Sequence, residues 1–339
     1  MKYLLGFMIM LLSISMLFAQ KGVEFTHKED QQAIEIWIHG QHISSYLYQD
    51  ELKKAVLYPL KTMSGKVLTR GFPLDTRPGE RVDHRHHLGH WFNYGDVNGL
   101  DFWNNSTDRP AEKRHRYGEV RHQEILKMEG GEEKGELILR SHWVDHEGKV
   151  LLEEKTTLHF QEKQGVILID RVSELTATED LLFKDNKEGM FAIRVRRELE
   201  LASDRPGLFA DKNAQIPKEK SQSSVEAQGN YKSSEGIIGG EVWGTRAKWM
   251  KLAGDLAGEK VEIIILDHSD NPGYPTYWHA RGYGLFAANP LGQAIFSKGK
   301  EQLNFQLAAG ASQVFRFRIL INEGNSLDKE VIEKFQKGF

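Results

Sequence analysis

Hydrophobic and polar residues alternate along much of the chain with a period of two. Ala33–Ile38 is one example, in which apolar residues flank Glu35; such alternation predicts a β-strand with one buried face. Four longer segments between residues 118 and 183 are separated by turns that contain glycine, which is typical of an antiparallel meander. The predicted strands of this meander are Gly118–Met128, Gly135–Val144, Val150–Phe160 and Gly165–Leu175.

Apolar segments of similar length continue through the rest of the chain. They predict further strands at Ile43–Tyr48, Val56–Leu60, Lys66–Thr69, Phe191–Leu201, Val261–Leu266, Gly284–Ala288, Leu303–Leu307 and Gln313–Ile321. Helical periodicity is confined to the C-terminus, where Leu327, Val331 and Phe335 recur every four residues after a suitable N-cap at Asn325 or Ser326. Strands do not alternate with long helices, which argues against a parallel nucleotide-binding sheet.

These patterns predict an all-β fold. We expect a large antiparallel two-sheet β-sandwich, formed by a single domain over residues 22–323, and a short C-terminal helix within residues 325–339. Residues 202–235 are polar and rich in Lys, Ser, Gln and Glu. They are predicted to form a long excursion from the sheets.

The first 19 residues have a different pattern. Lys2 precedes an uncharged apolar run from Leu4 to Phe18, and the small residue Ala19 follows. This order predicts a secretory signal peptide, because an apolar run of about 15 residues is shorter than the ~20 needed to span a bilayer. An uncleaved membrane anchor is the alternative. We therefore expect a periplasmic or secreted protein, with no stable membrane insertion once the signal is removed.

Composition narrows the range of functions. The chain has 339 residues, no cysteine and a net charge of -3. It therefore has no disulfide framework and no positive excess to hold a phosphate backbone, and we expect no nucleic-acid partner. Neither a glycine-rich dinucleotide motif nor a Walker loop is present, so no nucleotide cofactor is expected.

One group of chemically active residues lies in the segment Asp83–Trp103. Four of the 14 histidines fall within residues 84–90. Imidazole is both the usual acid–base group near neutral pH and a common ligand of divalent metals. Candidate catalytic residues are His84, His86, His87 and Asp101. Trp91 and Trp103 are candidates for stacking on a sugar face, with core packing as the alternative.

A second group follows the apolar strand Val261–Leu266. Residues 266–290 are rich in Pro, Gly and Asn, and we interpret their first part as a long loop, where binding groups often lie. The candidates here are His268 and His279 for acid–base chemistry and Trp278, Arg281, Tyr283 and Asn289 for substrate binding. Glu188, directly before Gly189, is the candidate carboxylate partner of the histidines.

Several stretches together form a signature. They are Pro59-Leu60, Val67-Leu68-Thr69-Arg70, Asp83-His84-x-His86-His87-x-Gly89-x-Trp91-Phe92, Gly95-Asp96-Val97-Asn98-Gly99-x-Asp101-Phe102-Trp103, Lys187-Glu188-Gly189-x-Phe191-Ala192, Pro275-Thr276-Tyr277-Trp278-His279 and Tyr283-Gly284-Leu285-Phe286-Ala287-Ala288-Asn289-Pro290. This signature resembles a secreted bacterial family labelled methane-oxygenase-subunit-like (PmoA-like), from Pro59 to about Gly292. The chain departs from the family pattern at Arg85, Leu88 and His90, where relatives usually have Pro, Arg and Leu.

The oxygenase label conflicts with the sequence. The membrane subunit of a methane oxygenase needs several spanning helices, and nothing after residue 19 is apolar for long enough to span a bilayer. The resemblance implies instead the β-sandwich group of sugar mutarotases and polysaccharide-processing proteins. That group implies a mutarotase-like supersandwich with a concave sheet face that holds a saccharide.

We therefore predict a secreted carbohydrate-active protein that acts on a sugar or glycan by His/carboxylate acid–base chemistry, as a lyase, epimerase or glycoside hydrolase. The predicted partner is a saccharide or glycan substrate. Two alternatives remain open: a metal-dependent enzyme whose histidine cluster binds a divalent ion, and a non-catalytic glycan-binding protein.

Overall fold

The computed structural model describes residues 22–339. The predicted signal peptide, residues 1–19, lies outside the described residues. In the described part of the chain, no helix is both long and apolar enough to cross a membrane.

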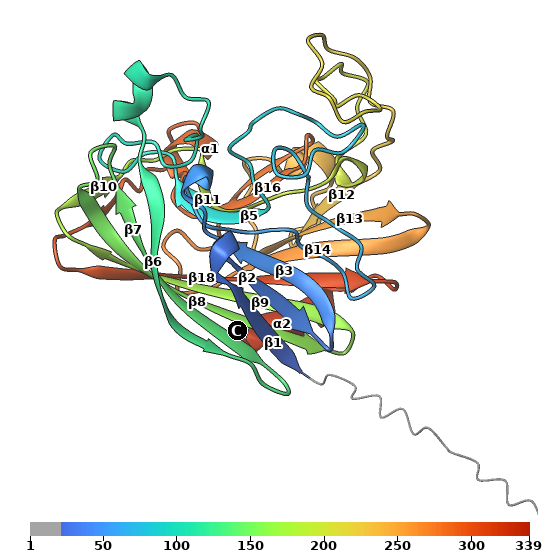
Figure 1. Ribbon diagram of the computed structural model, residues 1–339, viewed down its shortest axis with the longest axis horizontal. Coiled ribbons are helices and arrows are strands. Elements are labelled where there is room, and N and C mark those ends of the chain that lie inside the picture. The colour runs from blue at the N-terminus through green and yellow to red at the C-terminus, as the bar shows by residue number, and fades with distance from the viewer. Residues whose placement is uncertain (1–21) are drawn as a thin grey trace, which may run out of the picture.

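Two eight-stranded antiparallel sheets pack face to face (Figure 1). The strand order is β1-β2-β3-β4-β5-β11-β16-β15 in the first sheet and β12-β13-β14-β18-β9-β8-β7-β6 in the second. A small third sheet pairs β10 with β17. This architecture confirms the predicted all-β sandwich.

The elements have the following bounds. The first sheet contains β1 (Val23–Lys28), β2 (Ala33–Ile38), β3 (Gln41–Leu47), β4 (Val56–Leu57), β5 (His90–Tyr94), β11 (Gly189–Arg194), β15 (Tyr277–Arg281) and β16 (Leu285–Asn289). The second contains β6 (Glu119–Glu129), β7 (Gly135–Val144), β8 (Val150–Lys163), β9 (Val166–Ala177), β12 (Asn230–Ser233), β13 (Trp249–Leu256), β14 (Glu259–Asp267) and β18 (Ser312–Glu323). The remaining elements are β10 (Leu181–Phe183), β17 (Phe305–Leu307), the α-helices α1 (Gln293–Phe296) and α2 (Lys329–Lys337), and the 3₁₀ turns η1 (Glu29–Gln31), η2 (Asp50–Leu52), η3 (Ala111–Arg116), η4 (Arg197–Leu199) and η5 (Gly239–Val242).

The predicted meander forms half of the second sheet. Strands β6 to β9 pair in sequence order, and β18 adds to β9. Gly148 and Gly165 lie in its turns with φ of 91° and 82°, a left-handed conformation that glycine adopts without a steric penalty. The turn chemistry of the sequence therefore locates these hairpins correctly.

Two strands next to the candidate chemistry were not expected from the sequence. All five residues of β5 are buried, as are four of the five in β15. Strands buried on both faces lack the period-two alternation that identifies a strand. The prediction of one long loop after Leu266 is therefore wrong for Tyr277–Arg281.

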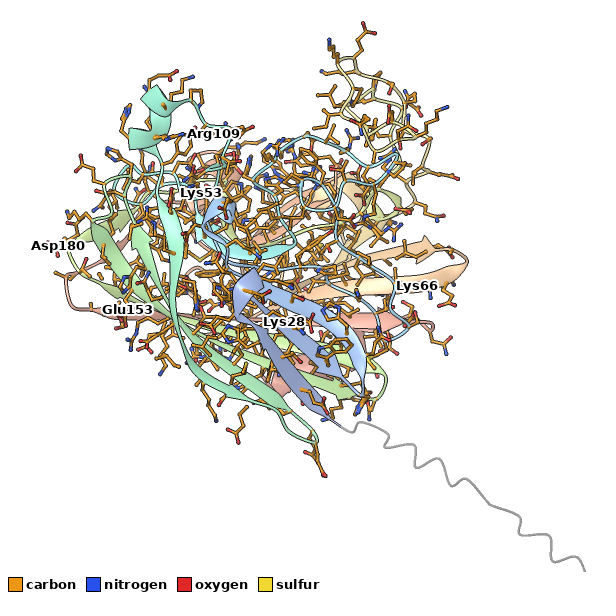
Figure 2. The ribbon with its side chains drawn as sticks, in the orientation of Figure 1. Lys28, Lys53, Lys66, Arg109, Glu153 and Asp180 are labelled. Atoms are coloured by element: carbon orange, nitrogen blue, oxygen red, sulfur yellow. The ribbon has the colours of Figure 1, made fainter. Side chains whose placement is uncertain are left out.

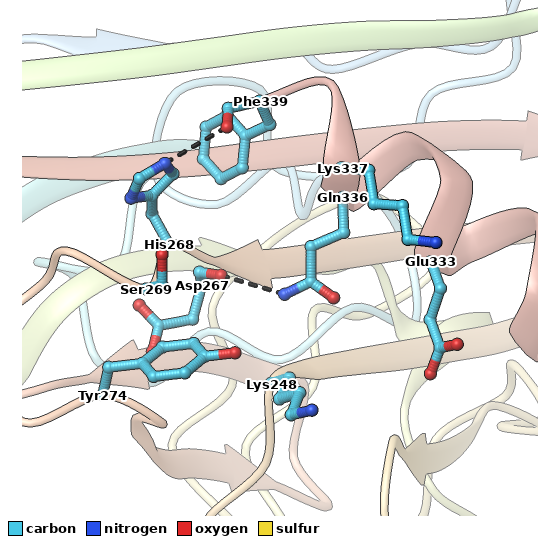
Figure 3. Close-up of a pocket in the computed structure, with 9 residues that line it drawn as sticks. All are labelled: Lys248, Asp267, His268, Ser269, Tyr274, Glu333, Gln336, Lys337 and Phe339. Atoms are coloured by element: carbon cyan, nitrogen blue, oxygen red, sulfur yellow. Dashed lines mark hydrogen bonds between the residues drawn. The ribbon is translucent and has the colours of Figure 1, made fainter.

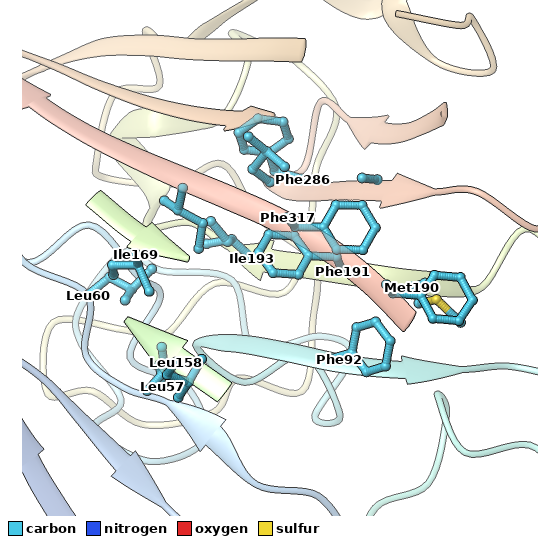
Figure 4. Packing of buried hydrophobic residues seen from close by; sticks show 14 of the residues in the cluster. Leu57, Leu60, Phe92, Leu158, Ile169, Met190, Phe191, Ile193, Phe286 and Phe317 are labelled. Carbon is cyan, nitrogen blue, oxygen red and sulfur yellow. The ribbon is translucent and has the colours of Figure 1, made fainter. Parts of the chain in front are cut away.

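The main core lies between the two large sheets. Figure 4 shows buried side chains of β11 and β18 meeting there, with the rings of Phe191 and Phe317 stacked at 4.6 Å. Ile193 from β11 joins the same cluster. Burial of these apolar side chains stabilises the sandwich and fixes which residues of the first sheet face outward.

The C-terminal helix packs on the outside of the second sheet. Asp328 is its N-cap and accepts a hydrogen bond from the backbone N–H of Val331, which replaces the expected cap at Asn325 or Ser326. The Ser326 hydroxyl instead donates to Glu262. Of the predicted stripe, Phe335 is buried, Val331 is partly buried and Leu327 precedes the helix; Ile332, which was not predicted, is the other buried residue of the helix.

Two excursions rise from the same side of the molecule, above β5, β11 and β16 (Figure 1). One contains η3, and Arg109 beside it lies at that side in Figure 2, as does Lys53. The other is the predicted polar excursion, residues 202–235, whose regular part is β12. The region between the two excursions carries the candidate site.

Candidate functional site

Side chains of the first sheet alternate between the core and an outer face. In β5, Phe92 packs in the main core, whereas Trp91 belongs to a separate cluster. In β15, Trp278 packs in the main core, so the neighbouring His279 and Arg281 project to the outer face. The candidate site lies on this outer face.

A row of small residues lies beside His279. The strand register places His279 opposite Ala287, Ala287 opposite Ala192, and Ala192 opposite Trp91. Both alanines are fully buried, so neighbouring side chains cover the outer face between His279 and Trp91. The histidine loop, residues 83–87, lies at the Trp91 end of this row.

Two buried arginines hold the histidine loop through Asp83. One Asp83 carboxylate oxygen lies 2.7 Å from Arg194 Nη2 and 2.9 Å from Arg70 Nη1. Arg70 also donates to the carbonyl oxygens of Asp83, His84 and His87, which fixes the backbone of the loop. Burial raises the pKa of Asp83, but the charge of Arg194 and a hydrogen bond from His84 outweigh it, so that pKa is held well below its usual range.

The rings of Tyr283, His84 and His87 form a stack. Centroids are 5.1 Å apart from Tyr283 to His84 and 4.9 Å apart from His84 to His87, with planes within 8° of parallel. Arg194 donates to Nδ1 of His87 at 3.0 Å, so the ring hydrogen of His87 is on Nε2. The stack links the β15–β16 turn, which carries Tyr283, to the histidine loop.

His86 is buried with two unsatisfied ring nitrogens. It is 5% exposed, and neither nitrogen has a hydrogen-bond partner among the described residues. Burial, with a smaller contribution from Lys54, lowers the pKa of His86 far below its ordinary value, so the ring is neutral. A neutral imidazole offers one donor and one acceptor, and buried polar atoms of this kind normally meet water or a ligand.

Lys54 is a buried ammonium group beside the same loop. Its Nζ lies 3.4 Å from the carbonyl oxygen of Trp103 and 5.5 Å from the ring centroid of Trp91. Burial lowers the pKa of Lys54 to about 7, against a smaller opposing effect of Asp101. Burial therefore favours the neutral form of Lys54 more than in an exposed lysine.

Glu188 and His279 meet on the outer face. Glu188 Oε2 lies 3.9 Å from His279 Nδ1. Burial lowers the pKa of His279 to about 3, while a backbone hydrogen bond to Lys187 acts in the opposite direction. His279 Nδ1 has no hydrogen-bond partner. The imidazole is therefore neutral and carries its hydrogen toward Lys187, so two acceptor atoms, Nδ1 and Oε2, face each other.

Asp101 is the second carboxyl group of the site. Its Oδ1 and Oδ2 accept hydrogen bonds from the backbone and side chain of Asn104 at 2.9 and 2.8 Å. Burial raises the pKa of Asp101, and the charge of Glu188 adds to this effect. The protonated form of Asp101 is thus favoured more than in an exposed aspartate.

Four predicted substrate-binding residues have structural roles instead. Trp91, Trp103 and Trp278 are fully buried, so none of them presents a ring face to a sugar. Trp278 packs in the main core and donates to the carbonyl oxygen of Ala247 at 3.0 Å. Asn289 is also buried and donates to the carbonyl oxygens of Asn186 and Lys187, which holds the segment that carries Glu188.

His268 lies at a different place on the molecule. It follows β14 of the second sheet, and its Nε2 is 3.1 Å from the carbonyl oxygen of Phe339. Figure 3 shows it beside the C-terminal helix, in a cavity of about 410 Å³. Since β14 and β15 belong to different sheets, the predicted union of His268 with the other histidines is wrong.

The metal hypothesis does not fit this arrangement. Within residues 22–339, no three His, Cys, Asp or Glu side chains are placed so as to hold a metal ion. His84 and His87 stack face to face, and His87 Nδ1 accepts from an arginine. Their nitrogens therefore do not converge on one point, as ligands of a metal do.

Residues 33–336 match a protein family described as a family of unknown function, DUF6807. The chain belongs to this family. The DUF6807 segment includes the histidine loop, Glu188 and β15, so the whole candidate site lies within it. No curated protein is significantly similar to the chain in sequence.

Solved structures with a related layout include sugar-acting proteins. A GH36 alpha-galactosidase from Geobacillus stearothermophilus in complex with 1-deoxygalactonojirimycin is 14% identical, with a TM-score of 0.38, over 83% of this DUF6807 chain and 39% of the galactosidase. A putative aldose 1-epimerase from Escherichia coli K12 is 10% identical, with a TM-score of 0.37, over 88% and 98% of the two chains. A galactose 1-epimerase from Lactobacillus acidophilus NCFM is 9% identical, with a TM-score of 0.33, over 90% and 99%. The chain thus spans about two fifths of the galactosidase, and likeness at this level does not define a shared activity.

Of the cations of the site, the sequence pointed to Arg281 but not to Arg194, Lys54 or Arg70. Arg194 ends the otherwise apolar strand β11 and is fully buried. Lys54 is 2% exposed and Arg70 is 1% exposed. A charged residue within an apolar run is the one available signal, because such residues are rarely buried without a partner. That signal applies to Arg194, whereas the burial of Lys54 depends on segments distant in the chain.

Proposed function

We propose that this DUF6807 protein binds a saccharide on the outer face of its first sheet and transfers protons to and from it. The observation that carries the proposal is the Glu188–His279 pair. Its two facing acceptors are 3.9 Å apart, about 1 Å longer than a hydrogen bond. These two acceptors cannot hydrogen-bond to each other. A sugar hydroxyl group placed beside both atoms would donate a hydrogen bond to one of them.

The pair also suits acid–base chemistry. His279 is neutral and has a free acceptor at Nδ1. The Glu188 carboxylate takes a proton from the sugar, and the neutral His279 accepts a hydrogen bond from a neighbouring hydroxyl and orients it. Asp101 is the candidate for returning a proton, since its pKa is raised by burial. Lyase, epimerase and glycoside hydrolase reactions all use such a transfer.

Neighbouring groups supply binding and orientation. The buried His86 offers a donor and an acceptor to sugar hydroxyls. Tyr283, which stacks on His84, borders the same outer face. The predicted signal peptide supports secretion or a periplasmic location as part of the proposal.

The test is to incubate the purified protein with a panel of mono-, oligo- and polysaccharides and to follow their anomeric signals by NMR. Epimerised, unsaturated and hydrolysed products give distinct signals. The Glu188→Gln variant is expected to lose at least about 100-fold in rate on any saccharide converted. Glu153→Gln, on the second sheet, is the matched control and should change the rate by less than about twofold.

The outcomes separate the alternatives. Conversion that depends on Glu188 supports the proposed enzyme. Binding of a saccharide that is never converted, and that weakens in Glu188→Gln, would establish a glycan-binding protein in place of an enzyme. Conversion that is unchanged in Glu188→Gln would place the chemistry elsewhere.

A further inference from the structure

A cavity of about 590 Å³ opens next to the proposed site. Arg281 and Tyr283 line one side of it, and Ser203 and Arg205 of the polar excursion line another. Tyr283 belongs to the ring stack with His84, and Arg281 follows His279 by two residues on the same face of β15. The cavity therefore borders the residues assigned to proton transfer through Arg281 and Tyr283.

The described lining of this cavity is positively charged. It contains three arginines, Arg81, Arg205 and Arg281, and no aspartate or glutamate. Arg81 is paired with Glu200, whose Oε2 lies 2.7 Å from its Nε. Arg205 and Arg281 have no carboxylate within ion-pair distance among the described residues. Two cations of the cavity thus remain without a counter-charge.

Three nearby carboxylates are engaged by other cations. Glu200 is shared by Arg81 and Arg197, with Arg197 Nη1 at 2.6 Å. Glu188 pairs with Lys187. Asp83 is held by Arg70 and Arg194, as described above. Neutralisation of Arg205 or Arg281 by any of these three carboxylates would require an existing ion pair to be broken.

Arg281 is held in place by aromatic rings. Its guanidinium carbon lies 5.2 Å from the ring centroid of Trp243 and 5.9 Å from that of Tyr283. Such cation–π contacts fix the guanidinium group without using its N–H donors. Trp243 is 36% exposed, and it lines the cavity.

We propose that this cavity is a subsite for a negatively charged unit of the saccharide. Arg205 and Arg281 bind its anionic oxygens, and the apolar face of the sugar ring packs on Trp243. Both a uronate carboxylate and a sulfate ester have the oxygens that a guanidinium group binds in a bidentate manner. The inference rests on the proposed function, because it names the class of saccharide that the same site takes.

The experiment measures binding by isothermal titration calorimetry to the full chain. The probes are an oligogalacturonate, a sulfated galactan oligosaccharide and a neutral galacto-oligosaccharide of the same length. We expect at least one anionic probe to bind about tenfold or more tightly than the neutral one, with an affinity that falls as salt is raised. The carboxylate and sulfate probes distinguish the two sources of the charge.

The double variant R205Q/R281Q is expected to remove this preference for anionic probes. R121Q on β6 of the second sheet is the control for the loss of positive charge and should keep the preference. Equal binding of neutral and anionic probes by the native protein would overturn the inference. A preference that persists in R205Q/R281Q would do so as well.

These outcomes differ from those that test the proposed function. Conversion of a neutral saccharide that requires Glu188, without any preference for charge, would reject the subsite alone. A charge preference that depends on the two arginines, without conversion of any probe, would support the subsite and reject the enzyme.

Discussion

His279 Nδ1 and Glu188 Oε2 lie 3.9 Å apart across an intervening strand. Glu188 directly precedes β11 and His279 is in β15, and β16 runs between these strands. We expect this pair to act as one catalytic unit, and a double-variant comparison tests that expectation.

His279→Gln and Glu188→Gln are each predicted to lower the rate of saccharide conversion by about 100-fold or more. The double variant should lose little more than the stronger single variant, because residues that act as a unit have non-additive effects. Rates measured at saturating substrate check this. Multiplicative losses would mean that the two groups act independently.

Asp83→Asn is predicted to destabilise the protein by about 3–5 kcal/mol, since it leaves the buried guanidinium groups of Arg70 and Arg194 without their counter-charge. Urea unfolding at neutral pH measures the change. Asp75→Asn is the control, because Asp75 is exposed and lies 3.6 Å from Arg77. Its effect should stay below about 0.5 kcal/mol. Similar effects of both substitutions would contradict a buried anchoring role for Asp83.

The protein is predicted to lose stability in acid through its buried neutral histidines. Burial lowers the pKa of His279 and of His90 to about 3, below the value of 6.5 that these groups have when unfolded. The unfolded chain therefore binds more protons between pH 6.5 and about 3, and stability falls as pH drops through this window. Each such histidine contributes up to about 1.4 kcal/mol per pH unit.

The slope of unfolding free energy against pH checks this prediction. His90→Phe should reduce the slope by about one proton, since it removes one titrating group in the core. An unchanged slope in His90→Phe would show that His90 does not titrate as its burial implies.

Two tryptophans are predicted to differ in their roles. Trp278→Phe should lower the free energy of unfolding by about 1–3 kcal/mol, because it removes buried ring atoms and the hydrogen bond to Ala247. Its effect on saccharide affinity should be small. Trp243→Ala should instead weaken saccharide binding while it changes stability little, because Trp243 is partly exposed. Thermal melts and calorimetric titrations of both variants measure the contrast, and the reverse pattern would refute it.

Gly95 directly follows β5 and lies against Glu188. The Gly95→Ala substitution is therefore predicted to disturb the site. An added Cβ would lie 2.7 Å from the Cβ of Glu188, closer than such atoms approach, so Glu188 would shift. Overpacking of this kind lowers the free energy of unfolding by ~1–3 kcal/mol. We expect the rate of conversion to fall by more than this loss of stability explains. Gly338→Ala, where the added Cβ meets nothing within 4 Å, is the control and should have neither effect. Full activity in a folded Gly95→Ala variant would show that the position of Glu188 is not critical.

Much of the fold was predictable because local patterns specify it. The meander of β6 to β9 follows from alternating residues and glycine turns, and the C-terminal helix follows from residues spaced four apart. The helix cap at Asp328 was not predicted, because serine and aspartate are equally suitable N-cap residues. Ser326 does not cap the helix because its hydroxyl donates to Glu262 instead. Strands β5 and β15 were not predicted, since burial on both faces removes their alternation.

The sequence by itself determined the all-β class and the residue types available for chemistry: clustered histidines, Asp101, Glu188 and His279. Only the tertiary structure decided which of them meet. Strand order joins Glu188 to His279 across β16 and separates His268 by placing it after a strand of the other sheet. Side chains alternate between the two faces along β5 and β15. Trp91 therefore faces outward, where the histidine loop covers it, and Trp278 faces inward to the main core. The physical reason is that pairing between strands distant in the chain fixes the neighbours and the face of every side chain, and no local pattern encodes that pairing.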